Sequence, residues 1–167
     1  MVPLFLLQRR FVHGLPVVGA VSGRICLAAL LTVAALYAVT ELIEWLQDIP
    51  LEPWLSFVTN ANASQLAVIA VLAIIAAPIS EELAFRHFLL AALPFKRNLL
   101  YAFLTVLGGA FVFMLMHSYE FWMTNLLMFL LAIVFAIARI RTGGLIVPIL
   151  MHGTASAIGL TIILIKS

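Results

Sequence analysis

Five long apolar stretches, separated by short segments that contain polar residues, glycine or proline, make up most of this chain. Each is long enough for a helix that crosses the roughly 30 Å hydrocarbon core of a bilayer. The alternation of apolar and polar positions that is typical of strands is absent from the sequence. The sequence therefore predicts an all-α, polytopic bundle of about five transmembrane helices, over residues 25–46, 64–93, 99–117, 122–140 and 145–165.

The second stretch, residues 64–93, is longer than a straight span requires. At about 1.5 Å per residue it measures roughly 45 Å, against about 30 Å of hydrocarbon. Pro78 lies near its middle and has no N–H to donate to the carbonyl of Ile74. We therefore expect this helix to tilt, break or project, with a kink just before Glu81.

Residues 1–24 differ from the rest of the chain because charged and small residues interrupt their apolar pattern. We expect an interfacial segment or a partial span here. The first seven residues have no basic region before their apolar run, so a cleavable signal peptide is not predicted. Residues 25–167 are predicted to form a single membrane domain.

Composition agrees with an integral, multi-pass membrane protein. Of the 167 residues, 65% are hydrophobic and only 10% are charged, and the mean hydropathy is +1.22. Ordinary globular domains are about 25% charged. The single cysteine, Cys26, excludes an internal disulfide.

Charged residues divide between the two ends of the predicted bundle. If the spans alternate in direction, seven of the nine Lys and Arg residues fall on one side and five of the seven acids on the other. By the positive-inside rule the basic side and the N-terminus are cytoplasmic. This partition accounts for the net charge of +2 and the pI near 9.0 without a nucleic-acid partner. The basic set is Arg9, Arg10, Arg24, Lys96, Arg97, Arg139 and Arg141.

Three charged residues lie within the second span, where a charge costs roughly 2.5–3.5 kcal/mol on insertion scales. Glu82 and Arg86 are four residues apart, so they share a helix face and can pair. Glu81 is rotated by about 100° from Glu82 and cannot use the same partner equally well. The pattern predicts one carboxylate held by an arginine and one, Glu81, left for chemistry. His87 points to a different face and is expected to be structural.

Two more polar side chains, His117 and His152, lie within apolar spans, and Ser156 follows His152 by one turn. With Asp48 as the only aspartate, a two-aspartate intramembrane protease is excluded. The sequence also lacks a Gly-x-Ser-x-Gly turn and a His-Glu-x-x-His helix. The remaining set, Glu81 with the two histidines, suits the activation of a water molecule by a carboxylate base.

A metal-dependent version of this chemistry stays open. No cofactor is required by the sequence, but Glu81, His117 and His152 form a His₂Glu set of the kind that binds catalytic zinc. On straight helices Glu81 lies about 20 Å from the cytoplasmic turns, His152 about 12 Å and His117 about 27 Å. They meet only if the third span is strongly tilted, and tilts up to about 40° occur in membrane proteins.

The chain resembles the CPBP family, the CAAX-protease and bacteriocin-processing membrane proteins that include the type II CAAX prenyl endopeptidases. The similarity covers about residues 64–165, and the motif order and spacing match the family. The matching motifs are Glu81-Glu82-x-x-x-Arg86, Phe113-x-x-x-His117, and Arg141-Thr-Gly-Gly followed by His152.

This resemblance implies an intramembrane endopeptidase in which Glu81 acts as a base on water. His117 and His152 would assist with water binding and with the oxyanion, while Glu82 and Arg86 support them. One position departs from the family, whose last motif has Asn or Asp four residues after the final histidine. Here that position is Ser156, a shorter hydrogen-bond donor.

The expected function is hydrolysis of peptide bonds in membrane-associated substrates, either prenylated CAAX-type proteins or bacteriocin leaders, in a cavity that opens toward the cytoplasmic half. The expected partners are a peptide or protein substrate, with or without a lipid, and membrane lipid. One alternative is a non-catalytic binding or immunity protein with the same fold, which Ser156 favours. Another is a proton-coupled carrier, because Glu and His also build proton relays.

Overall fold

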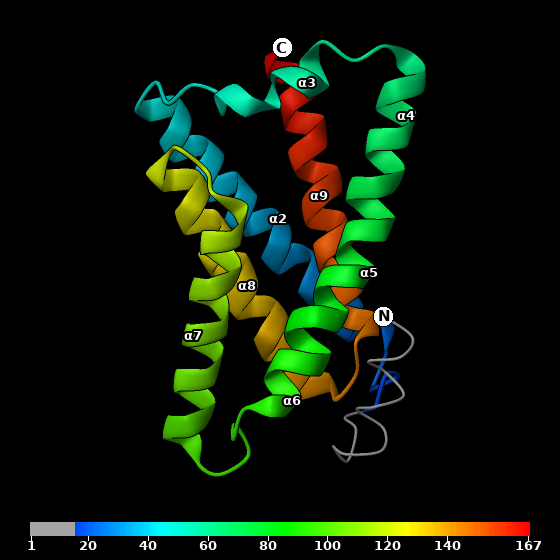
Figure 1. The fold of residues 1–167 in the computed structure, drawn as a ribbon, viewed down its shortest axis with the longest axis vertical. Helices are drawn as coiled ribbons and strands as arrows, with labels where there is room; N and C mark the ends of the chain where they lie inside the picture. Colours follow the sequence, from blue (N-terminus) through cyan, green and yellow to red (C-terminus); the bar gives the residue numbers. More distant parts are fainter. Residues whose placement is uncertain (1–15) are drawn as a thin grey trace.

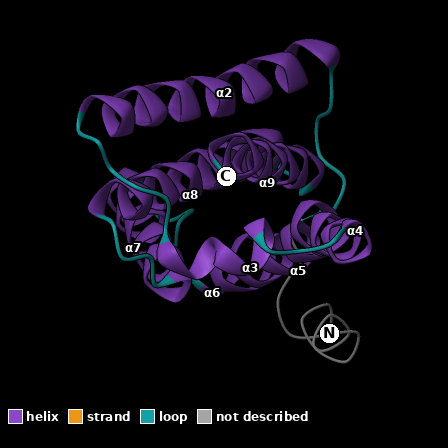
Figure 2. Cartoon of the chain, turned by 90° about the horizontal axis from the view of Figure 1, so that it is seen from above, coloured by secondary structure: helices purple, strands orange, loops and turns teal. Residues whose placement is uncertain are grey.

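Helices dominate the part of the chain that the computed structural model describes, residues 16–167, and no strand occurs among those residues (Figures 1 and 2). Five helical segments there are long and apolar enough to cross a membrane. They are α2 (Gly23–Leu46), the second span (Ala63–Ala92), α7 (Leu99–His117), α8 (Trp122–Thr142) and α9 (Ile146–Lys166). The predicted all-α bundle is confirmed, and most predicted ends lie within two residues of the observed ones.

The second span is helical from Ala63 to Ala92, and α-helical segments alternate with π-helical segments along it. It consists of α4 (Ala63–Val71), a π-helical segment η2 (Leu72–Ala76), α5 (Ala77–Glu82), a second π-helical segment η3 (Leu83–Leu89) and α6 (Leu90–Ala92). The first of these segments ends two residues before Pro78, in the region where the sequence predicted a kink. The second, directly after Glu82, was not predicted. Because π-helical turns change the angle between successive side chains, α5 presents its residues on faces that a regular helix would not give.

Polar side chains fix where several spans begin. Asn62 and Gln65 form a reciprocal capping box at the start of α4, and the side chain of Asn98 accepts a hydrogen bond at the start of α7. At the other ends, Ser118 after α7 and Gly143 after α8 adopt left-handed backbone angles. Left-handed residues of this kind stop a helix and reverse the chain within a few residues.

Helices α8 and α9 lie in the middle of the bundle, between α2 on one side and α7 with the second span on the other (Figure 2). The short helices η1 (Pro53–Leu55) and α3 (Ser56–Thr59) lie in the connection between α2 and the second span. The main core joins α2, α8 and α9, and a smaller cluster joins α7 to α8. The buried residues of the main core are Val33, Tyr37, Leu127, Leu131, Phe135, Val147, Met151 and Ala155.

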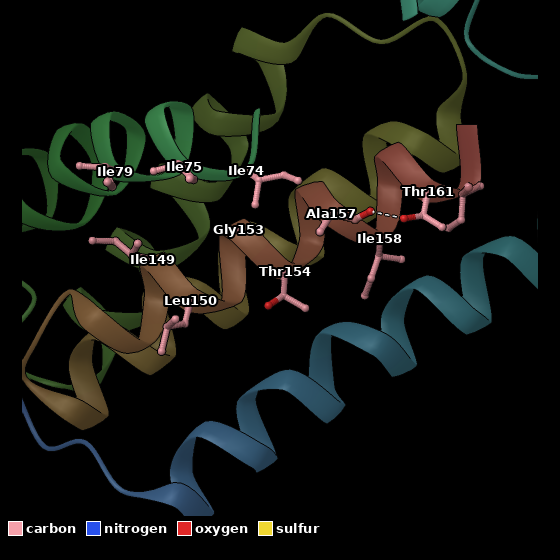
Figure 3. Close-up of a pocket in the computed structure, with 11 residues that line it drawn as sticks. Ile74, Ile75, Ile79, Ile149, Leu150, Gly153, Thr154, Ala157, Ile158 and Thr161 are labelled. Atoms are coloured by element: carbon pink, nitrogen blue, oxygen red, sulfur yellow. Dashed lines mark hydrogen bonds between the residues drawn. The ribbon is translucent and has the colours of Figure 1, made fainter. Parts of the chain in front are cut away.

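The second span and α9 touch backbone to backbone. A Cβ atom added to Gly153 would lie 2.8 Å from the carbonyl oxygen of Ile74, closer than real Cβ atoms approach an oxygen. This carbonyl is the one to which Pro78 has no N–H to donate. Figure 3 shows both residues where the two helices meet, beside an apolar groove of about 610 Å³. This contact fixes the position of α9 along the second span, and it does so at Gly153, the residue next to His152.

The segment before α2 is hydrogen-bonded to the turn between α8 and α9. The N–H of Ala20 donates to the carbonyl of Thr142, and the N–H of Leu145 donates to the carbonyl of Val17, each at 2.7 Å. Gly19 and Gly144 meet here with no room for a side chain on either. The interfacial segment or partial span predicted for residues 1–24 falls mostly on residues 1–15, outside the described residues.

Arg139 does not lie at a solvated turn, as the charge partition assumed. Its side chain is 1% exposed, with Nη1 donating to the carbonyl of Pro16 at 2.8 Å and Nε donating to the carbonyl of Arg86 at 3.1 Å. Those acceptors are 123 and 53 residues away in sequence. A buried arginine therefore joins the segment before α2, α8 and the second π-helical segment.

Candidate active site

Glu82 is the buried carboxylate of the site, and other side chains of the protein bind it. It has no exposed surface, and its Oε1 lies 3.1 Å from Nη1 of Arg86 and 3.0 Å from Nδ1 of His152. The guanidinium of Arg86 also donates through Nη2 to the carbonyl of Ala132 on α8. The predicted pairing of Glu82 with Arg86 is present, and the same oxygen also binds the imidazole of α9.

Two phenylalanines enclose this buried pair. The ring of Phe113 lies 4.7 Å from the guanidinium carbon of Arg86 and 4.4 Å from the ring of His117. The ring of Phe135 lies 5.4 Å from the same guanidinium carbon and stacks on His152 at 5.2 Å. Aromatic faces attract cations, so the arginine is stabilised away from water while both imidazoles are packed in place.

Glu81 lies between the two histidines that the sequence singled out. Its Oε2 is 3.8 Å from Nε2 of His117 and 3.8 Å from Nε2 of His152, although the three residues come from three different spans. The Glu81 side chain is 31% exposed, and its Oε2 has no hydrogen-bond partner in the described protein. The differences in depth that straight helices predicted are thus absent, and the second span, which carries Glu81, is not a regular α-helix because two π-helical segments interrupt it.

Hydrogen bonds at the other ring nitrogens fix the tautomers. Nδ1 of His117 lies 2.8 Å from the carbonyl of Phe113, and a carbonyl can only accept. Nδ1 of His152 lies 3.0 Å from the same oxygen of the Glu82 carboxylate that faces Arg86, and a carboxylate oxygen accepts. Each Nδ1 therefore carries a proton, so the Nε2 of each neutral ring presents a lone pair toward Glu81.

Three acceptors consequently face one another across gaps of 3.8 Å. Such a gap is too long for a direct hydrogen bond, and a water beside the three atoms can connect Glu81 to a histidine. A water molecule has two protons to donate, and donating both leaves its oxygen lone pairs unused. The three acceptors can therefore bind a water through its hydrogens. The lone pairs of the water oxygen then point away from these acceptors and remain available to attack a substrate.

A cavity of about 190 Å³ lies beside these groups. His117 and His152 line it together with Ser156, whose hydroxyl makes no hydrogen bond within residues 16–167. Its remaining wall is mostly apolar and aromatic. Those residues come from the connection before the second span, from the second span and from α2, α7, α8 and α9, and include Tyr37, Trp54, Phe57, Ile69, Phe113, Tyr119 and Phe135.

The cavity is lined at the end of the bundle that carries residues 47–62 and the turn after His117. The basic turns at Lys96, Arg97 and Arg141 lie at the opposite end. The sequence predicted that the basic end is cytoplasmic and that the site opens toward the cytoplasmic half. Because the cavity lies at the end opposite the basic turns, both predictions cannot be correct. The membrane side from which the cavity is reached stays a prediction.

The two histidines lie slightly farther from Glu81 than ligands of a bound zinc ion lie from one another. Ligands about 2.0–2.1 Å from a tetrahedral ion lie about 3.3 Å from one another, which is shorter than the observed 3.8 Å. Among residues 16–167, no group of three or more His, Cys, Asp or Glu side chains is arranged to hold a metal ion. The mechanism proposed below uses water and the protein's own groups, and the predicted zinc-dependent alternative is tested by removal of metal.

The site also contains residues that the sequence did not single out. Phe135 stacks on His152, and Tyr119 stacks on His117 with ring centroids 5.8 Å apart. Neither belongs to a charged or motif position, so only tertiary contacts reveal them. His87 is buried, as expected of a structural residue, with its ring edge-on to Phe88.

Comparison with known proteins gives two matches. The family model described as type II CAAX prenyl endopeptidase Rce1-like matches residues 63–158. A protein of Escherichia coli described as an uncharacterized 24.3 kDa protein is 30% identical over 159 residues, which is 94% of this chain and 73% of that protein. No solved structure matches.

Proposed function

The chain belongs to the Rce1-like family of type II CAAX prenyl endopeptidases, and on this basis we propose that Glu81 is the general base of an intramembrane endopeptidase. The family is one of proteases that act on peptides or proteins, and the chain is an integral, multi-pass membrane protein. The proposal concerns which residues perform the hydrolysis and how.

The position of Glu81 relative to the two imidazoles supports this assignment most directly. Its free oxygen lies 3.8 Å from each Nε2, and both Nε2 atoms are acceptors in the neutral rings. A water between them donates one hydrogen to Glu81 and the other to a histidine. Oε1 of Glu82 is held by Arg86 and His152 and that side chain is fully buried, whereas Glu81 is 31% exposed, so we assign the acceptance of the proton from that water to Glu81.

In the proposed reaction the water oxygen attacks the carbonyl carbon of the scissile peptide bond. Its proton passes to Glu81, and the carbonyl oxygen becomes the oxyanion of a tetrahedral intermediate. When the carbon–nitrogen bond breaks, Glu81 returns the proton to the leaving amine. The products are a new carboxyl end and a new amino end, and Glu81 is regenerated.

The oxyanion requires donors on the cavity wall. Ser156 supplies a hydroxyl. When the imidazole of His152 is protonated beside Glu82, its Nε2 donates to the oxyanion, and the water then donates to His117 rather than to His152. The Glu82 carboxylate stabilises such an imidazolium in the way an acid orients the histidine of a catalytic triad. A serine reaches less far than the Asn or Asp expected at this position from the resemblance to the family, so a slower reaction is expected.

The proposed substrates are membrane-associated peptides or proteins, either prenylated CAAX-type proteins or bacteriocin leaders. A peptide library, with and without attached isoprenoid, tests this in vesicles that contain the purified protein. Cleavage at a defined bond, lost in Glu81→Gln and retained in Glu120→Gln, is expected. Glu120 is an exposed acid outside the site and serves as the matched control.

Ser156 favours a second candidate, a non-catalytic binding protein of the same fold. In that case peptides bind without cleavage, and Glu81→Gln leaves both binding and any cellular phenotype unchanged. Binding measured in the same vesicles separates the two candidates.

A further inference from the structure

We propose that Tyr119 is a positioning residue that holds the imidazole of His117 toward Glu81, and that Glu52 holds Tyr119 in turn. The catalytic consequence rests on the proposed function, because it requires His117 to take part in hydrolysis. The positioning itself rests on contacts within residues 113–125 and between that stretch and residues 52–54, where the hydrogen-bonded residues are 68 and 69 apart in the sequence.

The first contact is between the two rings. Helix α7 ends at His117, and Ser118 follows with a left-handed backbone at φ 51°. This residue reverses the chain, so that Tyr119 folds back beside the helix it has just left. The rings of Tyr119 and His117 are nearly parallel, at 16°, with centroids 5.8 Å apart. The tyrosine thus packs against the histidine that faces Glu81.

Glu52 fixes the backbone of this turn. It comes from the connection between α2 and the second span, yet its side chain is only 4% exposed. Its two oxygens accept from the N–H groups of Glu120 at 2.9 Å and Phe121 at 3.0 Å. Backbone N–H groups bound to a carboxylate make strong, charge-assisted hydrogen bonds. A buried acid is therefore used to hold the two residues that directly follow Tyr119.

Two more residues fix the same turn. The side-chain amide of Asn125 donates to the carbonyls of Tyr119 at 2.8 Å and Phe121 at 2.9 Å. The ring of Trp54, two residues after Glu52, packs on Tyr119 at 5.5 Å. The turn is thus held through its N–H groups, its carbonyls and the tyrosine ring itself.

Within its own helix, His117 is held by Phe113 alone. It is the last residue of α7, and its one described hydrogen bond runs from Nδ1 to the carbonyl of Phe113. That bond sets the tautomer, and the aromatic rings of Phe113 and Tyr119 then limit the movement of the imidazole. Catalytic groups must be held within about 0.5 Å of their working geometry, so such packing affects rate.

The phenol is suited to this place. Burial, followed by the nearby carboxylates of Glu52 and Glu81, raises the pKa of Tyr119 to about 12. The side chain therefore stays uncharged at neutral pH and does not repel either acid.

Kinetics with paired variants test the catalytic part. Tyr119→Leu keeps an apolar side chain but removes the ring, and we expect kcat to fall about 10–100-fold with little change in KM. Tyr119→Phe keeps the ring and should recover most of that loss. Tyr101→Leu, at the other end of α7, is the matched control. Equal losses in the Leu and Phe variants, or a loss mainly in KM, overturn the proposal.

A double-mutant cycle asks whether Tyr119 acts through His117. In a His117→Ala background, Tyr119→Leu should cause no further fall in kcat, because the group that it positions is gone. An undiminished fall in that background contradicts the proposal. Glu52→Gln should reproduce a part of the Tyr119→Leu effect, while Glu120→Gln should not.

A chemical measurement tests the positioning without any need for activity. Diethyl pyrocarbonate modifies accessible imidazoles, and mass spectrometry follows each histidine separately. Tyr119→Leu should raise the modification rate of His117 several-fold and leave that of His152 unchanged. An unchanged rate at His117 overturns the proposal even if the protein is a protease. A raised rate in a protein without protease activity supports the positioning and rejects the proposed function instead.

Discussion

The carbonyl oxygen of Ile74 lies so close to Gly153 that a Cβ atom there would be 2.8 Å from it. The residue before Gly153 is His152, and seven residues after Ile74 comes Glu81. This backbone contact between the second span and α9 therefore sets the distance between a histidine and the carboxylate that it faces.

Replacing Gly153 should separate the two helices. Gly153→Val is expected to lower the rate of peptide cleavage at least about tenfold, because a displacement near 1 Å at a reacting group can cost about 100-fold. The unfolding midpoint in detergent should also fall. Gly108→Ala is the control, since a Cβ at Gly108 meets nothing within 4 Å. A Gly153→Val protein with normal cleavage would show that this contact does not position the site.

The buried pair of Glu82 and Arg86 should affect stability and activity differently. Arg86→Met leaves the Glu82 charge buried without its cation, which should reduce the free energy of unfolding by about 3–5 kcal/mol. The double variant Glu82→Gln, Arg86→Met removes both charges and should recover most of that loss, yet remain poorly active because His152 loses its carboxylate. Unfolding in mixed detergent micelles measures the first effect and peptide cleavage the second.

A partly exposed ion pair elsewhere in the protein provides a comparison for the stability loss expected of Arg86→Met. Lys166 contacts Glu41 and Glu44 near the far end of α9, with about a third of its side chain exposed. Lys166→Met should cost less than about 1 kcal/mol. If Arg86→Met costs no more than Lys166→Met, the Glu82 site is not a buried charge pair in the native protein.

Arg139 should matter more than its neighbour Arg141. The first is buried and donates to two distant carbonyls, while the second is exposed on the same helix. Arg139→Leu leaves the carbonyls of Arg86 and Pro16 without donors and should cost about 1–3 kcal/mol for each that stays buried. Arg141→Leu should change stability by less than about 0.5 kcal/mol. Equal effects in the two variants contradict the role assigned to Arg139.

Removing metal should not stop the reaction. The proposed mechanism needs only the Glu81 carboxylate, the two imidazoles and a water, with each imidazole 3.8 Å from the carboxylate. Peptide cleavage is therefore expected to continue at an unchanged rate after exhaustive dialysis against a chelator. Loss of cleavage, restored by one equivalent of zinc per chain, would assign Glu81, His117 and His152 as ligands instead.

The orientation in the membrane can be tested with single cysteines in a Cys26→Ser background. Phe57 is exposed beside the cavity, and Leu99 is exposed at the basic end. The positive-inside rule predicts that an impermeant thiol reagent added outside intact cells labels Phe57→Cys but not Leu99→Cys. The reverse pattern would place the cavity on the cytoplasmic side.

Much of this molecule was predictable from residue patterns. The spans follow from uninterrupted apolar runs, so only their ends shift by a residue or two. The pairing of Glu82 with Arg86 follows from their spacing, and the free state of Glu81 follows from the pairing. The catalytic roles assigned to Glu81, His117 and His152 stay predictions, although the structure brings the three side chains together.

What the sequence did not predict depends on distant contacts. The second π-helical segment has no local signal comparable to Pro78. From the sequence, Glu52 is indistinguishable from any other acidic residue in a loop. Only the structure shows that it accepts hydrogen bonds from a turn 68 and 69 residues away. Arg139 likewise looks like part of a basic turn, because nothing nearby in the sequence shows that carbonyls on two other segments surround it.

The rate of cleavage by Glu81→Gln, measured in vesicles on a peptide that the unmodified protein cleaves, tests the central claim most directly. The substitution keeps the size of the side chain and removes its ability to take a proton from water. The account predicts a loss of about 100- to 10,000-fold, with substrate binding retained and with Glu120→Gln unaffected. Cleavage at the unmodified rate by Glu81→Gln would contradict it.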